Sequence, residues 1–359
     1  MICEQQDSYI KLGKMELTKV AIYSISHGLI DACCAAIIGA NILLAGKNLT
    51  ELTFSIVMYN IIAFALQTPV GLVVDKIKKP AESAALGCIL VLIGLIFYKW
   101  FFVALIISGL GNAFFHVGGG VIILNLRPGK AALPGIYVAP GAIGLLIGTL
   151  IGKSVFFSPL FFSLLLIIAA ASIVSFGISH FSYNNKVYPI NFGRFDIVII
   201  CILSSVAIRG LVGSMLAYNW KVNLMLLAVF TVAVALGKGF GGILGDAFGW
   251  TRVTIGGLII SAPLLVLGIK VPILAIAGVF FFNLTMPITL VITSIMLPGK
   301  PGFAFGLTTL ALIIGVFPTF TKLKPVLCSN NGALIMAAVL IMALLLWFGL
   351  KAFFSVKND

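Results

Sequence analysis

The sequence predicts an all-α integral membrane protein, with twelve transmembrane helices in two pseudo-repeated six-helix halves around a central cavity. Three observations carry this prediction. Of the 359 residues, 61% are hydrophobic and only 9% are charged, whereas about 25% of the residues in a soluble domain are charged. The apolar residues form long continuous runs, and two loop motifs of the first half recur in the second half.

The composition excludes several classes of protein. So few charges could not cover the water-facing surface of a soluble chain of this length. The strands of a membrane barrel would alternate in polarity over about 10 residues, which these runs do not do. Lipid offers no partners to backbone N–H and C=O groups, so the runs must be helical. At about 20 residues per span, the chain has room for about 12 helices and for no soluble domain.

Each expected span is an apolar run bounded by polar or turn-forming residues. The clearest breaks are at residues 46–48, 78–80, 127–130 and 297–300, where Lys, Arg, Asn, Pro and Gly gather. The spans are expected at residues 18–44, 52–74, 81–98, 101–125, 131–152, 159–180, 195–217, 222–245, 251–269, 271–297, 302–321 and 330–354.

The longest connection, from Ser182 to Arg194, divides the chain in the middle. It predicts an N-terminal half at residues 1–180, a central cytoplasmic linker at 181–194 and a C-terminal half at 195–359. The formal net charge is +13. With the N-terminus inside, 14 of the 23 Lys and Arg residues lie in inner segments, 7 in outer segments and 2 within spans. This bias predicts a cell-membrane protein with both termini in the cytoplasm, and it implies no nucleic-acid partner.

The first apolar run is too long for the core of a cleavable signal peptide, so we expect it to be a span. The cysteines form no Cys-x-x-Cys pair, and most lie inside apolar runs. We therefore expect buried thiols, and neither a metal site nor a cofactor is predicted. The six cysteines are Cys3, Cys33, Cys34, Cys88, Cys201 and Cys328.

An internal repeat relates the two halves. Residues 71–75 and 242–246 both read Gly-x-x-x-Asp, 171 residues apart. Residues 128–130 and 298–300 both read Pro-Gly-Lys, 170 residues apart. Two matches in one register, at equivalent loops, indicate a duplicated six-helix unit. Parallel six-helix halves are a transporter architecture, with the substrate site near the midplane between them.

The loop after the second span resembles the signature of the major facilitator superfamily, Gly-x-x-x-Asp-Arg-x-Gly-Arg-Arg. Gly71, Asp75, Lys76 and Lys79 match this pattern, whereas Lys78 stands at its second Gly. The resemblance covers essentially the whole chain. It implies two halves that alternately expose a central site to either side of the membrane.

The second-half copy of this loop keeps Gly242, Asp246 and Gly249 but lacks the basic residue after Asp246. A carboxylate at a helix end can face the N-terminus of another helix, where free N–H groups and the helix dipole favour an anion. The resemblance implies that Asp75 and Asp246 latch the halves together in one state. The alternative is a topogenic lysine cluster with an incidental aspartate.

Three further stretches are similar to efflux proteins of the fosmidomycin-resistance type, although Val117-Gly118 replaces the Pro-Glu that usually follows the histidine of span 4. This resemblance implies export of a small molecule in exchange for protons. The glycines of span 5 also predict close helix packing. The stretches are Ser26-His27-x-x-x-Asp31, Phe115-His116-x-x-Gly119 and Gly141-x-x-Gly144-x-x-x-Gly148.

Ionisable groups at membrane depth are costly, and each is a functional candidate. Asp31 lies well inside an apolar run, with His27 one helical turn before it. Because histidine titrates near neutral pH, this pair predicts a proton-coupling site. The alternatives are a static polar contact, or a position of Asp31 nearer the outer surface. His116 has Asn112 one turn before it. Both are candidates for the substrate cavity, or for hydrogen bonds between helices.

Arg209 lies in the middle of span 7 and keeps its charge at any accessible pH, so it needs an acid, an anion or water. We expect it either to pair with Asp31 across the cavity or to hold an anionic substrate. Lys238, near the inner end of span 8, is expected to extend to the surface. Asn283 is a further candidate for the cavity, or bonds a neighbouring helix.

These features predict a secondary active transporter that exports a small molecule in exchange for protons. The open alternatives are uptake or facilitated diffusion of a metabolite, and a receptor-like protein that transports nothing. An enzyme is not expected, because the three histidines lie in different spans and form no pair at metal-ligand spacing. The expected partners are a small-molecule substrate, protons and the lipid bilayer, and the protein is expected to be a monomer.

Overall fold

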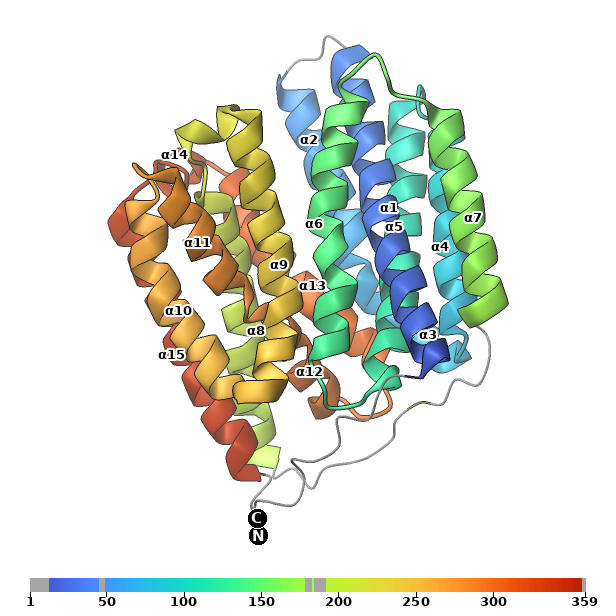
Figure 1. Ribbon diagram of the computed structural model, residues 1–359. Helices are drawn as coiled ribbons and strands as arrows, with labels where there is room; N and C mark the ends of the chain where they lie inside the picture. The colour runs from blue at the N-terminus through green and yellow to red at the C-terminus, as the bar shows by residue number, and fades with distance from the viewer. Residues whose placement is uncertain (1–12, 45–48, 178–182, 184–191, 357–359) are drawn as a thin grey trace.

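The computed structural model describes residues 13–44, 49–177, 183 and 192–356. The helices of residues 14–177 form one group and those of residues 192–356 form a second group beside it (Figure 1). The expected all-α architecture in two halves is confirmed. The expected linker at 181–194 lies largely outside the described residues.

The N-terminal group contains six apolar segments. The second segment is interrupted by one π-helical turn, an irregularity that is often found at functional sites. Its elements are α1 (Lys14–Leu44), α2 (Leu49–Asn60), η1 (Ile61–Ala65), α3 (Gln67–Ile77), α4 (Pro80–Ile96), α5 (Phe101–Leu126), α6 (Ala132–Gly152) and α7 (Pro159–Gly177).

The C-terminal group repeats this plan. One expected span is divided at Leu284 and Thr285, just before Pro287, whose ring nitrogen has no hydrogen to donate to the preceding turn. The elements are α8 (Phe192–Met215), η2 (Asn219–Val222), α9 (Leu224–Phe248), α10 (Trp250–Leu267), α11 (Pro272–Asn283), α12 (Met286–Met296), α13 (Pro301–Val316), η3 (Phe317–Phe320), α14 (Lys324–Leu327) and α15 (Gly332–Val356).

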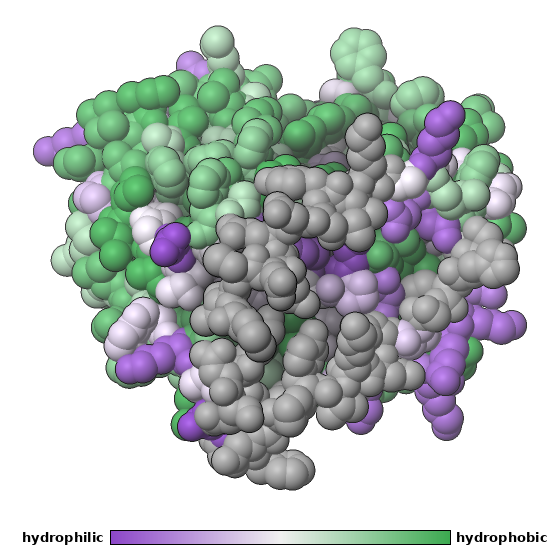
Figure 2. Space-filling view, turned by 60° about the horizontal axis from the view of Figure 1, so that its bottom comes forward, coloured by the Kyte–Doolittle hydropathy of each residue, from purple (hydrophilic) through white to green (hydrophobic). Residues whose placement is uncertain are grey.

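Eleven helices of the described chain are long and apolar enough to cross a membrane, and α4 is a shorter apolar helix of 17 residues. Together they account for the twelve expected spans. Large apolar side chains such as Phe161, Ile168 and Phe348 are exposed on the outside of the bundle, where lipid would cover them. α1 begins and α15 ends at the same end of the bundle (Figure 1). Hydrophilic residues gather on that end face, while hydrophobic residues dominate the flanks in view (Figure 2).

The glycine stripe of α6 lets this helix pack closely along α1. Gly144 lies against the backbone of Gly28, and Gly148 lies against the backbone of Ala32. A side chain at either glycine would collide with a main-chain carbonyl of α1. Small residues permit this approach in lipid, and it brings α6 up to the polar residues in the middle of α1.

Candidate functional site

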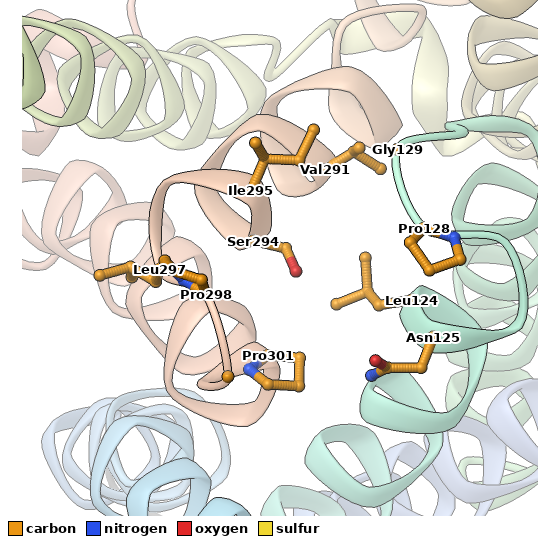
Figure 3. Close-up of a pocket in the computed structure, with 11 residues that line it drawn as sticks. Leu124, Asn125, Pro128, Gly129, Val291, Ser294, Ile295, Leu297, Pro298 and Pro301 are labelled. Atoms are coloured by element: carbon orange, nitrogen blue, oxygen red, sulfur yellow. The ribbon is translucent and has the colours of Figure 1, made fainter. Parts of the chain in front are cut away.

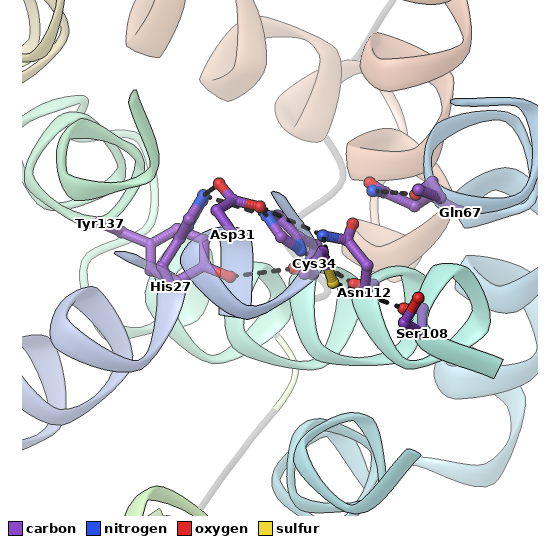
Figure 4. A network of polar contacts seen from close by, with 9 residues as sticks. His27, Asp31, Cys34, Gln67, Ser108, Asn112 and Tyr137 are labelled. Atoms are coloured by element: carbon purple, nitrogen blue, oxygen red, sulfur yellow. Dashed lines mark hydrogen bonds and ion pairs between the residues drawn. The ribbon is translucent and has the colours of Figure 1, made fainter. Parts of the chain in front are cut away.

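Three ionisable side chains meet inside the N-terminal half, and we call them the His–Asp–His cluster (His27, Asp31 and His116). Oδ2 of Asp31 lies 3.4 Å from Nε2 of His27, and Oδ1 lies 3.5 Å from Nε2 of His116. The two Nε2 atoms lie 3.0 Å apart. Asp31 is 6% exposed and each histidine 5%. α1 supplies two members and α5 the third (Figure 4).

Asn112 orients the cluster. Its side-chain amide donates to Oδ1 of Asp31 at 3.1 Å, and its main-chain oxygen lies 2.8 Å from Nδ1 of His116. A carbonyl oxygen only accepts, so Nδ1 of His116 carries the hydrogen and Nε2 of the neutral ring is an acceptor. That acceptor faces Nε2 of His27, which therefore donates when both rings are neutral. Nδ1 of His27 has no hydrogen-bond partner in the described structure.

α6 closes one side of the cluster. The Tyr137 hydroxyl donates to the main-chain oxygen of His116 at 3.2 Å, and the ring centroids of Tyr137 and His27 lie 4.7 Å apart. A Cβ atom added to Gly141 would lie 2.5 Å from Oδ2 of Asp31 and 2.6 Å from Nε2 of His27. Sequence reasoning missed Tyr137. Its place in span 5, one turn before the glycine stripe that begins at Gly141, was the available signal.

The expectation that the histidines form no pair is wrong for His27 and His116, because the packing of α1 against α5 brings their rings together. The cluster can share a proton between two imidazoles and a carboxylate.

The ligand atoms of the cluster also lie within 4.8 Å of one another, a spacing that a metal ion could use. Lys238 is within electrostatic range of His27 and Asp31. Its positive charge opposes a divalent cation more strongly than a single proton.

The C-terminal half contributes two cations to the interior. Arg209 of α8 is 8% exposed, and its Nη1 donates to Oγ1 of Thr289 on α12 at 3.4 Å. Among the described residues, the ion pairs of Asp31 are with the two histidines and not with Arg209. Lys238 does not extend to the surface as expected. It lies within electrostatic range of both Asp31 and Arg209, because its segment of α9 packs against Gly135 of α6 in the other half.

Asn283 is the last residue of α11. Its amide donates to the main-chain oxygen of Val279 at 2.8 Å, and Gly237 of α9 packs against its Cβ atom. The described contacts of Asn283 are thus with its own helix and its neighbour in the same half. A role in the cavity stays a prediction.

The two signature loops make equivalent contacts between the halves. Asp75 of α3 accepts hydrogen bonds from the backbone N–H groups of Gly302 (2.9 Å) and Phe303 (2.8 Å) at the start of α13. Gly71, one turn earlier, lies directly against the backbone of Gly302. α13 has no side-chain cap of its own. The carboxylate of the other half supplies the acceptor that a helix start requires.

The second-half copy mirrors this arrangement. Asp246 of α9 accepts hydrogen bonds from the N–H groups of Ala131 (2.9 Å) and Ala132 (2.9 Å) at the start of α6, and from Nε1 of Trp250. Gly242 lies against the backbone of Ala131. The repeat in the sequence is therefore also a repeat in contacts, and each half caps a helix of the other.

The remaining signature residues lie at the same end. Lys76 and Lys79 are exposed. Gly249 joins α9 to α10 with a φ of 95°, a conformation that favours glycine. Between the two Pro-Gly-Lys loops lies a small pocket at the seam of the halves (Figure 3). Its lining includes Asn125 and Pro128 from the first half, and Ser294 and Pro298 from the second.

No protein-family model and no curated protein matches the sequence. Solved structures match the fold. A crystal structure of the E. coli fucose:proton symporter FucP is 14% identical with a TM-score of 0.60, covering 92% of this chain and 99% of that one. A structure of FucP in the outward conformation is 15% identical with a TM-score of 0.58 and the same coverage.

The proton:xylose symporter XylE is 15% identical with a TM-score of 0.61, covering 93% of this chain and 95% of that one. At these identities the likeness shows the fold. The matched proteins are transporters and not enzymes, and they do not confirm the resemblance to the fosmidomycin-resistance branch. The chain has the two-half fold of the major facilitator superfamily transporters.

Proposed function

We propose that this protein is a proton-coupled secondary transporter that moves a small molecule across the membrane by alternating access. The observation that carries the proposal is the His–Asp–His cluster. Three ionisable groups in mutual contact, each at most 6% exposed, lie inside a transporter fold. Such groups are expensive at membrane depth, and a role in ion translocation explains their presence.

The cluster can load and release a proton without breaking its own geometry. His27 and His116 each contact a different oxygen of Asp31, so a proton gained by any member is stabilised by the other two. The main-chain oxygen of Asn112 contacts the ring of His116, and the ring of Tyr137 packs against the ring of His27. In this mechanism Asp31 and His27 carry the coupling proton, and His116 connects them to α5.

The latches provide the two states that alternating access requires. Asp75 and Asp246 bind the halves together at the end of the bundle where α1 begins and α15 ends. Breaking these contacts frees that end to open, while the small pocket between the Pro-Gly-Lys loops marks the seam. The substrate would bind between the halves, near Arg209 and Lys238.

The direction of transport does not follow from the cluster or from the latches. Export in exchange for protons rests on the resemblance of three short stretches, and it stays a prediction. FucP and XylE are symporters. A monomeric state, the cytoplasmic position of the termini and residence in the cell membrane also stay predictions.

The test is solute flux in proteoliposomes of the full-length protein under an imposed pH gradient. A mixture of small metabolites should include at least one whose flux follows the gradient and stops with an uncoupler. Asp31→Asn, which is nearly isosteric, should abolish that dependence. Asp196→Asn changes an exposed carboxylate on α8 and should keep it. Wild-type flux that does not depend on the pH gradient would favour facilitated diffusion. The absence of flux for every solute tested would favour a receptor-like role.

A further inference from the structure

Arg209 and Lys238 are two cations that form one group of interacting charges with a single carboxylate, Asp31. Arg209 of α8 and Lys238 of α9 interact electrostatically, and Lys238 also acts on Asp31 and His27 of α1. With the histidines neutral, the charge of this region is positive by one unit. A positive excess in a membrane interior needs a counter-charge.

The donors of these two cations are largely unused. A guanidinium has five N–H donors, and the described residues give Arg209 one acceptor, Oγ1 of Thr289 at a long 3.4 Å. For Lys238 the described part of the chain provides no hydrogen-bond acceptor and no ion pair. The side chain of Arg209 is 8% exposed and that of Lys238 is partly buried, and burying such donors without acceptors is costly. An anionic oxygen group supplies both the missing acceptors and the missing charge, and a guanidinium binds it in a bidentate manner.

We propose that the substrate is a small anion with a carboxylate or phosphate group, which binds between the halves at Arg209 and Lys238 together with a proton on the His–Asp–His cluster. This inference rests on the proposed transport function. It adds the class of substrate and the sign of the coupling.

The position of Lys238 between the anion site and the His–Asp–His cluster determines the sign of the coupling between anion binding and proton binding. An anion beside Lys238 offsets the positive charge that Lys238 presents to His27 and Asp31, so the cluster gains a proton more readily. By reciprocity, a proton on the cluster strengthens binding of the anion. A cationic substrate would compete with the proton instead. Joint binding moves the anion and the proton in the same direction, in contrast to the proton exchange that the branch resemblance implies.

Other groups around the cluster do not carry this effect. The titratable side chains that interact with Asp31 from the packed elements are His116 on α5, Tyr137 on α6, Tyr59 on α2 and Cys34 on α1 itself. Tyrosine and cysteine are neutral near pH 7. A proton taken up together with the anion is therefore assigned to the cluster, with Lys238 and Arg209 as its positive neighbours.

The experiment measures ligand-induced thermal shifts and affinities of the full-length protein in detergent. The probes are D-glucuronate, L-lactate, citrate and inorganic phosphate, with D-glucose and glycerol as neutral controls. We expect at least one anion to stabilise the protein, while the neutral controls do not. The carboxylates and phosphate separate the two anion chemistries. No shift with any anion at millimolar concentration, or an equal shift with the neutral controls, overturns the inference.

Variants locate the site. Arg209→Gln and Lys238→Gln should each weaken anion affinity at least about tenfold, and Arg209→Lys should recover part of the loss because the charge remains. Arg252→Gln and Lys270→Gln alter exposed cations of the same half and should change little. Unchanged anion affinity in the Arg209 and Lys238 variants would contradict the assignment.

The pH dependence tests joint binding. A carboxylate probe that binds, such as D-glucuronate, stays ionised from pH 8 to pH 6, so a change in its affinity reports on the protein. We expect affinity to rise about tenfold over this interval, and to lose this dependence in Asp31→Asn. Weaker binding at low pH would overturn joint binding. Proton-driven flux of neutral solutes alone would refute this inference but leave the proposed function standing, whereas anion binding without proton-driven flux would refute the proposed function.

Discussion

The Nε2 atoms of His27 and His116 lie 3.0 Å apart, although 89 residues separate the two histidines in the chain. Two protonated imidazoles at this distance would repel each other strongly in a weakly polar interior. The pair therefore holds one proton more easily than two, and Asp31 stabilises that proton. The charge of the cluster therefore changes by one unit between its proton-free and its proton-loaded state, and a coupled transporter needs such a change.

This contact predicts that His27→Gln and His116→Gln are not additive. Each change removes one half of the same contact, so the second should cost less than the first. Their interaction energy should fall in the range of about 0.5–3 kcal/mol for side chains in contact. It can be measured from unfolding midpoints of the two single variants and the double variant in detergent. The pair His27→Gln and Arg252→Gln should add within about 0.5 kcal/mol, and similar additivity for the two histidines would contradict the contact.

Gly141→Ala should disrupt the cluster more than a small substitution normally would. The new Cβ atom would lie 2.5 Å from Oδ2 of Asp31 and 2.6 Å from Nε2 of His27. Overpacking of this kind costs about 1–3 kcal/mol, and it would separate α6 from α1 at the proton site. We expect a lower unfolding midpoint and loss of proton coupling.

Gly256→Ala is the matched control for this variant. It replaces a helical glycine of α10 that has no neighbouring atom within 4 Å of the new Cβ. It should be neutral or stabilising, because alanine favours a helix by about 1 kcal/mol over glycine. If Gly141→Ala behaved like Gly256→Ala, the close contact of α6 with the cluster would be wrong.

The number of helices was predictable because it depends on local features. Lipid imposes a minimum length on each apolar run, and breaks such as residues 127–130 contain the residues that end helices. Sequence reasoning could also place Asp75 and Asp246 at helix ends, since the repeat marked both. It could not name the helix starts that receive them, because Gly302 lies 227 residues after Asp75.

The polar interior was predictable only in part. The pair of His27 and Asp31 follows from helical spacing, whereas the approach of His116 depends on how α1 packs against α5. Lys238 was misplaced for the same reason. Its distance from the end of a span suggested a route to the surface, but the orientation of α9 is determined by packing against Gly135 of the other half.

The latches predict a shift in conformation when either aspartate is neutralised. Asp75→Asn and Asp246→Asn keep the shape of the side chain but weaken charge-assisted hydrogen bonds, each worth about 1.5–3 kcal/mol. We expect the end of the bundle that carries these residues to open more often. Because the repeat makes the two contacts equivalent, the double variant should open further than either single variant.

Spin labels at Lys130→Cys and Lys300→Cys, one on each Pro-Gly-Lys loop, can report this opening as a longer distance. The labels require that Cys201 and Cys328, which are partly exposed, and Cys3, which lies outside the described residues, are first replaced by serine, whereas Cys33, Cys34 and Cys88 are buried. Asp196→Asn, on an exposed surface of α8, should leave the distance distribution unchanged. An unchanged distribution in Asp75→Asn and Asp246→Asn would show that these contacts do not hold the halves together.

Lys221, in the short connection between α8 and α9, predicts a pH dependence of stability. Its Nζ donates to the main-chain oxygen of Leu216 at 2.7 Å and lies 3.9 Å from the ring centroid of Phe230. Burial lowers the pKa of Lys221 from 10.5 to about 8. The charged form is therefore disfavoured by folding. The free-energy cost of burying the charged ammonium group is fully present below about pH 8. It disappears as the pH rises through 8 towards 10.5, the pKa of the lysine in the unfolded chain.

We therefore expect the unfolding midpoint of the wild type to rise relative to that of Lys221→Met as the pH is raised from 8 to about 10. Comparing the two proteins at each pH removes the contributions of all other titrating groups. Lys270→Met, at an exposed position of the same half, should show a constant difference from the wild type over this interval. If Lys221→Met also showed a constant difference, the attraction of the ammonium group to the Phe230 ring would be compensating its loss of hydration, and the lysine would titrate as it does in water.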